Sequence, residues 1–597
     1  MKTLPHGRII LTPPSLGPVI ARTGINTVDV RLGHDDAQGR PLLVGALPQS
    51  LSTLPQASRR ALYVPWTELL YDGDNSCIGL IKLDLPWSLD PNLTWLLFLV
   101  LAQPADLHFQ ASSAGPRQCV PLSLALARFK WMKDARTRPD PRPHLADDID
   151  TALATWLGLA PATRPAFSPL KQPDDQHLLH VRDVEDDLPN EPTRFVLGSC
   201  QYPPGMLDHT PASGQWRPSP PDKTLAALDH LRQSPGSAPD FVLLVGDQVY
   251  IDEAAGLFDP ALSADRYGAP YTHWLSQPMA QKALSGLPLH TMLDDHEVTD
   301  NWAPLSELAQ GQQADGTPDP HVLLHQIDLL LRGVNSYKTF QGPPGFLPSG
   351  LKSTTLWRQV GPANRPGMVF LADTRTERAL RHSGNIDAAE IMSENQFSAL
   401  GAWLARADTG PRFLACPAMV LPRRRWAVGT TPASALYADA WDGYPHSLHR
   451  LLATLHTHRC QHIILLSGDE HLASISMVEI TSTLQPEPTR VHLVHAPGLY
   501  APFPFANARP SDFLAPDTLR FTDPLTPGNQ VQCHVQTWFG PPADGLVHVE
   551  APLRLKAHHK VKVTLVLGDT PGVPIEPIPD WLSQSTMLDV TIQPNPL

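Results

Sequence analysis

The sequence contains few cysteines, and they are not spaced as pairs. Six cysteines occur in 597 residues, and no two of them form a CxxC motif. This pattern argues against the disulfide framework of small secreted domains and against a CxxC zinc site. Without a disulfide framework, the reducing cytoplasm is the default compartment.

The chain also lacks an excess of basic residues and any long apolar run. Lysine and arginine total 46 against 59 acidic residues, which gives a formal net charge of −13. Such a charge repels a nucleic-acid backbone, so we expect no nucleic-acid partner. The run TWLLFLVLA at 94–102 is too short to span a bilayer, and the proline-interrupted amino terminus does not resemble a secretory signal. We therefore expect a cytoplasmic protein without a membrane span.

Proline is the abundant outlier of the composition. The chain has 65 prolines, about twice the usual frequency of roughly 5%. They fall between apolar runs, which predicts stiff loops around a compact core. The length exceeds what one hydrophobic core normally serves, so about two to four structural units are expected.

Changes in composition and in the pattern of apolar residues along the chain predict four regions. Residues 1–132 alternate β-rich fragments with turns and predict an amino-terminal β domain, and residues 133–193 are a Pro/Asp-rich linker region with one short helix near 150–157. Residues 194–484 alternate strands with amphipathic helices, which predicts a layered α/β core, and residues 485–597 are β-rich again. Core helices are expected at 222–234, 321–340, 394–407 and 446–460, the third with a capping box from Ser393 and Gln396.

Three strand-like runs of the core end in acidic residues. FVLLVGDQVYID, residues 241–252, delivers Asp247, Tyr250 and Asp252 after a glycine. PLHTMLDDHEVTDNW at 288–302 and HIILLSGDEHLASIS at 462–476 repeat this design, and RFVLGSC ends on Cys200. Carboxylate and phenolate oxygens are ligands of hard metals, and ligands of α/β sheets bind where strands end. The pattern therefore predicts a metal centre at these strand ends.

The same blocks resemble a known family. The GD of Asp247 with Tyr250, DDHE at 294–297 and GDEH at 468–471 are similar, in this order, to the GD, GNH and GHxH blocks of calcineurin-like and purple acid phosphatase-type metallophosphoesterases. Together with GSC, DTR at 373–375 and WDGYP at 441–445, they resemble the alkaline phosphatase D (PhoD) family over about 194–476. The resemblance implies an α/β fold with an αββα sandwich metallophosphoesterase core, an amino-terminal β-sandwich-like domain and β-rich carboxyl-terminal additions. Members of this family are often exported, which this amino terminus does not indicate.

The resemblance also implies the site chemistry. One metal, Fe³⁺, would be held by Cys200, Asp247, Tyr250 and His471, and a second, Ca²⁺, by Asp295 and Asp469 together with Asp247, with Zn²⁺ or Mn²⁺ as the alternatives. Two metals about 3.5 to 4 Å apart can clamp a phosphate and turn a shared water into hydroxide. His296 would hydrogen-bond the phosphate or protonate the leaving oxygen.

Several residues keep more than one interpretation. Cys200 is a metal ligand, a buried small side chain or, less simply, a nucleophile without an identifiable His partner. Arg375 either binds two phosphate oxygens or makes a structural contact. Trp441 and Tyr444 form either an aromatic wall for the leaving group or a packed turn. The remaining acidic residues near these motifs are expected to be solvated or to act through the ligands: Asp252, Glu253, Glu297, Asp300 and Glu470. Four further histidines are expected to be ordinary strand or surface residues and not ligands: His492, His495, His558 and His559.

The sequence therefore predicts a metal-dependent hydrolase of small-molecule phosphoric esters, as a phosphomonoesterase, a phosphodiesterase or both. The alternative is a non-catalytic binding or scaffold protein that retains the metallophosphoesterase core. Neither the physiological substrate nor the oligomeric state follows from the sequence.

Overall fold

A computed structural model describes most of the chain from residue 191 onward. Before that point it describes ten strands. The described ranges of the later part are 191–202, 220–234, 236–252, 267–284, 287–304, 320–342, 355–362, 365–406, 410–429, 432–501, 508–555, 559–568 and 577–594. The helix expected near 150–157 and most of the linker region expected at 133–193 lie outside the described residues.

The chain divides into two compact units. The smaller unit comprises Met1–Glu185, Tyr271–Leu289 and Thr339–Pro348. The larger unit comprises Asp186–Pro270, His290–Lys338 and Ser349–Leu597. All the candidate site residues except those in the undescribed segments fall in the larger unit, so that unit decides the chemistry.

The smaller unit is built mainly from antiparallel strands. One sheet has the order β1-β8-β10, with β4 also on β8, a second has the order β2-β3-β7-β6, and β5 pairs with β9. The short helices α6 and α7 come from the later part of the chain. The bounds are β1 (Ile10–Thr12), β2 (Leu16–Gly24), β3 (Thr27–His34), β4 (Arg40–Pro48), β5 (Tyr63–Val64), β6 (Glu68–Asp72), β7 (Cys77–Asp84), β8 (Thr94–Ala102), β9 (Val120–Pro121), β10 (Leu178–His180), α6 (Ala269–Ser276) and α7 (Pro278–Leu284).

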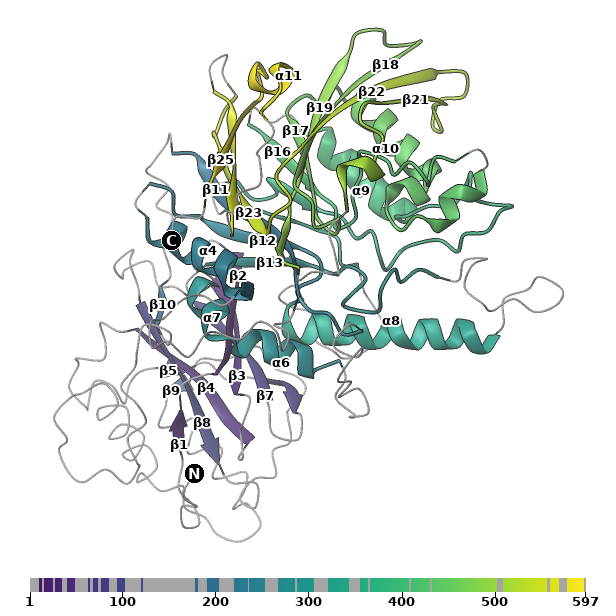
Figure 1. Cartoon of the computed structure of the whole chain (residues 1–597). Coiled ribbons are helices and arrows are strands. Elements are labelled where there is room, and N and C mark those ends of the chain that lie inside the picture. Colours follow the sequence, from purple (N-terminus) through teal and green to yellow (C-terminus); the bar gives the residue numbers. More distant parts are fainter. Residues whose placement is uncertain are drawn as a thin grey trace, which may run out of the picture. The chain divides into compact units, whose positions relative to one another are not determined.

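The larger unit contains two mixed sheets (Figure 1). The first has the order β13-β12-β11-β23-β24-β25, with β20 also paired to β11. Its strands are β11 (Thr193–Gln201), β12 (Phe241–Val245), β13 (Leu289–Met292), β20 (Gly498–Tyr500), β23 (Gly545–Ala551), β24 (Val561–Leu567) and β25 (Leu588–Gln593). The strands β11 and β12 are parallel, so their carboxyl ends meet at one edge.

The second sheet has the order β14-β15-β16-β17-β19-β18-β22-β21. Its strands are β14 (Arg358–Val360), β15 (Val369–Leu371), β16 (Arg412–Ala415), β17 (Ile463–Ser467), β18 (Ser474–Ser482), β19 (Thr489–His495), β21 (Asp517–Thr522) and β22 (Gln530–Phe539). The four strands from β15 to β19 in this order are parallel neighbours. The strands expected after residue 485 are present, and they extend both sheets of the larger unit.

The two sheets face each other across one apolar cluster, and helices cover the outer face of the second sheet. Val369 and Leu371 join Phe195 and Leu243 of the first sheet in one cluster, whereas Phe370 lies in a second cluster with the side chains of α9 and α10. Because β15 and β17 of the second sheet are buried on both faces, their sequences, VFL and IILLS, are almost entirely apolar. The mixed α/β architecture expected from the sequence is confirmed (Figure 1).

The four core helices expected from the sequence are also present. They are α4 (Lys223–Gln233), α8 (Pro320–Phe340), α9 (Glu394–Leu404) and α10 (Pro445–Thr457), and a short α11 (Asp580–Ser583) follows near the end. The hydroxyl of Ser393 caps α9 by accepting from the Gln396 N–H at 3.3 Å. The reciprocal half of the capping box differs, because the Gln396 side chain donates to Glu377 and to the Asp373 carbonyl instead. Among the described helices, none is long and apolar enough to cross a membrane.

The pH dependence of stability tests the burial of His492 in β19. Its Nε2 lies 3.2 Å from the Ser585 hydroxyl, and burial, with a smaller effect of Arg490, lowers its pKa from 6.5 to about 4. Between these two values the unfolded chain binds a proton that the folded chain does not. This contribution to stability is therefore fully present above about pH 6.5 and is lost as the pH falls toward about 4.

We expect His492→Gln to remove this dependence. The free energy of unfolding is measured by urea denaturation at about pH 7.5 and at about pH 5. Its decrease from the higher to the lower pH should be about 2 kcal/mol smaller in the variant than in the wild type. The exposed His458, changed to Gln, controls for the substitution itself. Identical pH dependence in the wild type and His492→Gln would contradict the prediction.

Candidate metal centre

Acidic residues from three strand ends converge in the larger unit. Asp247 follows β12, Asp294 and Asp295 follow β13, and Asp469 follows β17 of the other sheet. One carboxylate oxygen from each of the four lies within 4.8 Å of those of the others. We call these four residues the acidic cluster. A second group, which shares two members with the cluster, adds a ring nitrogen of His296.

Close backbone approach makes this convergence possible. Gly246 has φ +101°, and a Cβ atom there would lie 2.5 Å from the Cβ of Asp294. Gly468 precedes Asp469, and a Cβ atom there would lie 2.4 Å from the Ser199 side chain. Only glycine fits at these two positions without moving the neighbouring strand end.

Left-handed backbone conformations gather at the same place. Five of the six described non-glycine residues with positive φ lie in the motifs of the site: Cys200 (57°), Asp247 (57°), Asn301 (52°), Asp469 (84°) and His471 (53°). This conformation is unfavourable for residues with a side chain, and it persists only where the surroundings fix it. Such strain at consecutive strand ends indicates a functional site.

The remaining predicted ligands lie beside the cluster. The Cys200 Sγ is 3.4 Å from Asp247 Oδ2, and the Tyr250 hydroxyl is 3.1 Å from His471 Nε2. Burial, together with nearby anionic groups, raises the pKa of the Cys200 thiol and of the Tyr250 phenol well above their ordinary values. The structure thus places all six predicted ligands in one region of the larger unit.

The donor set fits bound cations. Asp247 Oδ1, Asp294 Oδ2 and Asp295 Oδ1 are buried and accept no hydrogen bond from any described residue. Burial, followed by repulsion from neighbouring carboxylates, raises the pKa of Asp247 and of Asp469 well above its ordinary value. Buried, unsatisfied carboxylate oxygens are costly unless a cation or a proton compensates them. Oxygen ligands of this kind suit hard cations.

His296 is held next to the cluster by Asp252. Its Nδ1 is 2.9 Å from Asp252 Oδ1, so the ionised carboxylate keeps the proton on that nitrogen and leaves Nε2 for other contacts. Burial lowers the pKa of His296, but Asp295, Asp252 and Asp247 together raise it well above its ordinary value. The structure therefore gives Asp252 a positioning contact.

Glu297 joins two strand ends through the backbone. Its carboxylate accepts from the N–H groups of Asp247 at 3.1 Å, Gln248 at 2.8 Å and Asp294 at 2.8 Å. Burial raises the pKa of Glu297 to about 7, although these backbone contacts lower it. Glu297 thus fixes the residues on both sides of the cluster without contributing to it.

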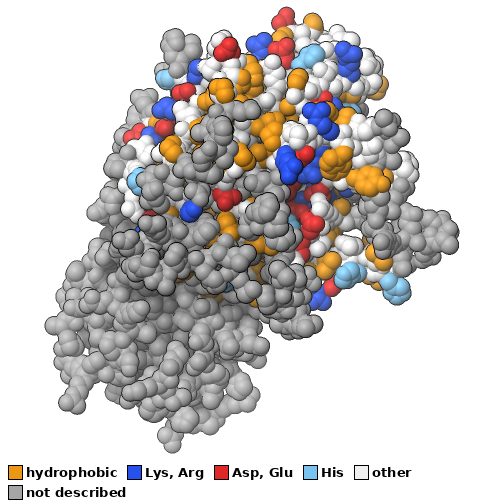
Figure 2. All heavy atoms as spheres, in the orientation of Figure 1, with side chains coloured by type: hydrophobic (Ala, Val, Ile, Leu, Met, Phe, Trp, Pro, Cys, Tyr) orange, Lys and Arg blue, Asp and Glu red, His pale blue; other side chains and the backbone are white. Residues whose placement is uncertain are grey.

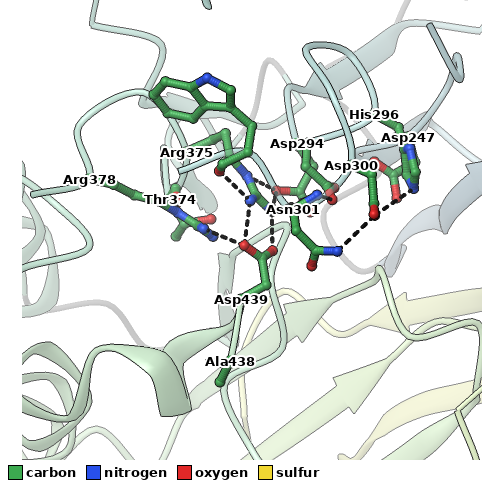
Figure 3. Close-up of polar contacts among 12 residues, drawn as sticks. Asp247, Asp294, His296, Asp300, Asn301, Thr374, Arg375, Arg378, Ala438 and Asp439 are labelled. Carbon is green, nitrogen blue, oxygen red and sulfur yellow. Dashed lines mark hydrogen bonds and ion pairs between the residues drawn. The ribbon is translucent and has the colours of Figure 1, made fainter. Parts of the chain in front are cut away.

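Arg375 contacts carboxylates of the protein. The side chain is fully buried, and its Nε and Nη2 donate to Asp294 Oδ1 at 2.8 and 2.6 Å (Figure 3). Nη1 and Nη2 donate to Asp439 at 2.9 and 2.8 Å, and Nη1 also donates to the Trp302 carbonyl at 2.9 Å. Because all five N–H groups are used, the structure favours the structural role over phosphate binding.

Trp441 and Tyr444 are also fully buried. Both side chains belong to the apolar cluster between α9, α10 and the second sheet. The guanidinium carbon of Arg381 lies 4.4 Å from the centre of the Tyr444 ring. These contacts favour the packed turn over the aromatic wall for a leaving group.

Two carboxylates that complete this region, Asp294 and Asp439, have no role predicted from the sequence. Asp294 was visible as the first acid of DDHE, but the neighbouring Asp295 carried the family resemblance. Asp439 lies in a loop after η6 (Pro432–Tyr437), with no motif or strand end to mark it. The contact between Asp439 and Arg375 arises only on folding and could not be predicted from the sequence.

The other acidic residues near the motifs differ in their surroundings: the Asp300 side chain is exposed, as expected, whereas Glu470 is paired. Glu253 and His558 lie outside the described residues. Glu470 is buried and binds Arg424, with Nε at 3.0 Å from Oε1.

Over the face drawn in Figure 2, the acidic and basic side chains of the described residues are interspersed. His495 is buried and contacts the Ser467 hydroxyl at 2.8 Å.

Comparison with known proteins supports the resemblance that the motifs carry. The model of the PhoD-like phosphatase family matches residues 212–495, which confirms the family resemblance and supports a phosphoesterase function. No curated protein matches the chain.

Two solved structures match the chain. The structure of PhoD is 12% identical over 91% of this chain and 85% of that chain, with a TM-score of 0.49. The purple acid phosphatase PPD1 from seeds of yellow lupin (Lupinus luteus) is 10% identical over 94% of this chain and 72% of that chain, with a TM-score of 0.44.

The contacts of Glu297 predict a loss of stability on substitution. Glu297→Gln replaces one acceptor oxygen by an amide that faces backbone N–H groups, so at least one buried donor loses its partner. We expect the free energy of unfolding to fall by about 1–3 kcal/mol, measured by urea denaturation at about pH 8, where the carboxylate is largely ionised. The exposed Glu487, changed to Gln, is the control. Equal stability of the two variants would contradict the role assigned to Glu297.

Proposed function

We propose that this protein is a metal-dependent hydrolase of phosphoric esters. The observation that supports this most strongly is the acidic cluster, in which four carboxylates from two sheets meet and three buried oxygens accept no hydrogen bond from described residues. A structural role does not require such concentrated negative charge. A site that binds cations for catalysis does.

The proposed fold of the larger unit is an αββα metallophosphoesterase core. Two facing sheets with α9 and α10 outside one of them, and α4 in contact with β20, β23 and β24 of the other, support it. In such a core the strand ends of both sheets hold the catalytic groups at one edge.

The proposed cofactors are Fe³⁺ and Ca²⁺, with Zn²⁺ or Mn²⁺ as alternatives. Thiolate, phenolate and imidazole ligands suit Fe³⁺, whereas the carboxylates suit Ca²⁺. Bound cations of this kind would supply charge that neutralises the phosphate and Lewis acidity that activates water. The residues proposed to hold them are Cys200, Asp247, Tyr250 and His471 for the first, and Asp247, Asp295 and Asp469 for the second.

His296 is proposed as the residue that contacts the phosphate or protonates the leaving oxygen. Its Nδ1 contact with Asp252 fixes the ring and directs the proton-carrying Nε2 of the charged form away from Asp252. The hydrogen bond to the Asp252 carboxylate favours that charged form. A phosphate ester is therefore met by a cationic donor at this nitrogen.

Substitution of Asp247 tests the proposal. Asp247→Asn removes the charge of one of the two carboxylates shared by both groups of potential ligands. The kcat/KM on an aryl phosphate monoester and on a bis-aryl phosphodiester should therefore fall by at least about 100-fold. The metal content of the purified variant should fall as well.

The exposed Asp328 of α8, changed to Asn, provides the matched control. It should retain the activity and the metal content of the wild type. A folded Asp247→Asn variant with wild-type turnover would show that the site assignment is wrong. Wild-type protein with bound metal and no activity on either substrate would favour the non-catalytic alternative.

The iron assignment is tested by colour. A phenolate or thiolate bound to Fe³⁺ gives a ligand-to-metal charge-transfer band, which Ca²⁺ and Zn²⁺ do not give. We expect a coloured protein, and we expect Tyr250→Phe to shift or bleach the band. Phenylalanine keeps the volume of this buried ring, so thermal stability in the absence of metal serves as the control. A colourless, fully active protein that contains only zinc is incompatible with this assignment.

A further inference from the structure

Arg375 divides its hydrogen bonds between the acidic cluster and a carboxylate outside it. Two of its N–H groups share a single oxygen of Asp294, Oδ1, and two others bind one oxygen each of Asp439 (Figure 3). The Asp439 contact is the bidentate arrangement in which arginine and carboxylate bind most strongly. The guanidinium plane is therefore fixed mainly by Asp439.

This arrangement leaves the other oxygen of Asp294 available. Oδ2 is buried and accepts no hydrogen bond from a described residue, and a carboxylate oxygen of Asp294 lies within 4.8 Å of ligand atoms of the other three cluster residues. A carboxylate cannot rotate freely when one of its oxygens accepts two hydrogen bonds from the same arginine. The direction in which its second oxygen points is thereby fixed.

Charge balance gives Asp439 a second effect. Asp439 also accepts from Nη1 of the fully buried Arg378 at 2.7 Å. The two positive charges of Arg375 and Arg378 are therefore balanced by the two negative charges of Asp294 and Asp439. Without Asp439, two buried positive charges would remain near the cluster and would oppose the binding of a cation.

We propose that Asp294 is a further metal ligand through Oδ2, and that Asp439 is a positioning residue that acts on it through Arg375. The inference rests on the proposed metal-dependent function. It gives Arg375 the task of orienting a ligand instead of binding phosphate. Outer contacts of this kind typically change metal affinity by about 10- to 100-fold when they are removed.

The test measures metal binding without substrate. Full-length protein is freed of metal by a chelator and titrated with Mn²⁺, and the free ion is followed by electron paramagnetic resonance. We expect Asp439→Asn, which keeps the shape and removes the charge, to weaken Mn²⁺ binding by about 10- to 100-fold. Asp294→Asn should weaken it as well.

The combination of both changes separates positioning from a general structural effect. If Asp439 acts mainly through Asp294, then Asp439→Asn should change the affinity clearly less in an Asp294→Asn background than in the wild type, because only its effect on the charge of the arginines remains. Asp517→Asn is the matched control, because Arg423 binds the largely buried Asp517 through two contacts of 2.7 and 2.9 Å. It should lower stability without changing Mn²⁺ affinity.

Each outcome decides the inference. Equal Mn²⁺ affinity of Asp439→Asn and the wild type overturns it, as do fully additive losses in the double variant. If Asp439→Asn does not fold, Asp439→Glu displaces the carboxylate and keeps its charge, and unchanged affinity in that variant overturns the inference. Absence of Mn²⁺ binding by the wild type overturns both this inference and the proposed metal centre, whereas binding without phosphatase activity removes only the proposed hydrolysis.

Discussion

Repulsion among buried carboxylates is the constraint on which the rest of the larger unit depends. Asp247, Asp294, Asp295 and Asp469 follow strand ends and bring their oxygens within 4.8 Å of one another. The first three are buried, and Asp469 is half-buried. At such distances like charges disfavour the ionised form, and burial adds to this effect. The fold can hold this arrangement only if positive charge or strong hydrogen-bond donors compensate it.

The backbone around the cluster fixes the position of each carboxylate despite this repulsion. Gly246 and Gly468 allow neighbouring strand ends to approach, and Glu297 fastens three backbone N–H groups across β12 and β13. The positive φ values of Asp247 and Asp469 show that the surroundings impose these positions at a local conformational cost. The stability of the two buried sheets offsets this cost, because their shared apolar cluster extends to the strands that carry the site.

The sequence predicted those parts of the site that local chemistry determines. An apolar run that ends in an acid marks a strand end, with a glycine between them before Asp247 and Asp469 but not before Asp295. These three residues and the layered α/β core could therefore be located without the structure. The contacts of Arg375, Trp441 and Tyr444 could not be predicted from the sequence, because the burial of these side chains depends on loops that are distant in the sequence. An arginine in a motif resembles a phosphate ligand until its partners are known, and Asp439 lies 64 residues away from it.

The type of positive charge beside the cluster explains why the site can still accept a cation. Arg375 is held by Asp294 and Asp439 together, and it lies 3.5 Å from Asp295 only through Nη2. Because arginine cannot lose its proton in a protein, it neutralises one side of the cluster permanently. A lysine there could move toward the centre and occupy the space of a cation, whereas the planar guanidinium is fixed at the edge by its five hydrogen bonds. The unsatisfied oxygens of Asp247 and Asp294 therefore remain for a second source of positive charge.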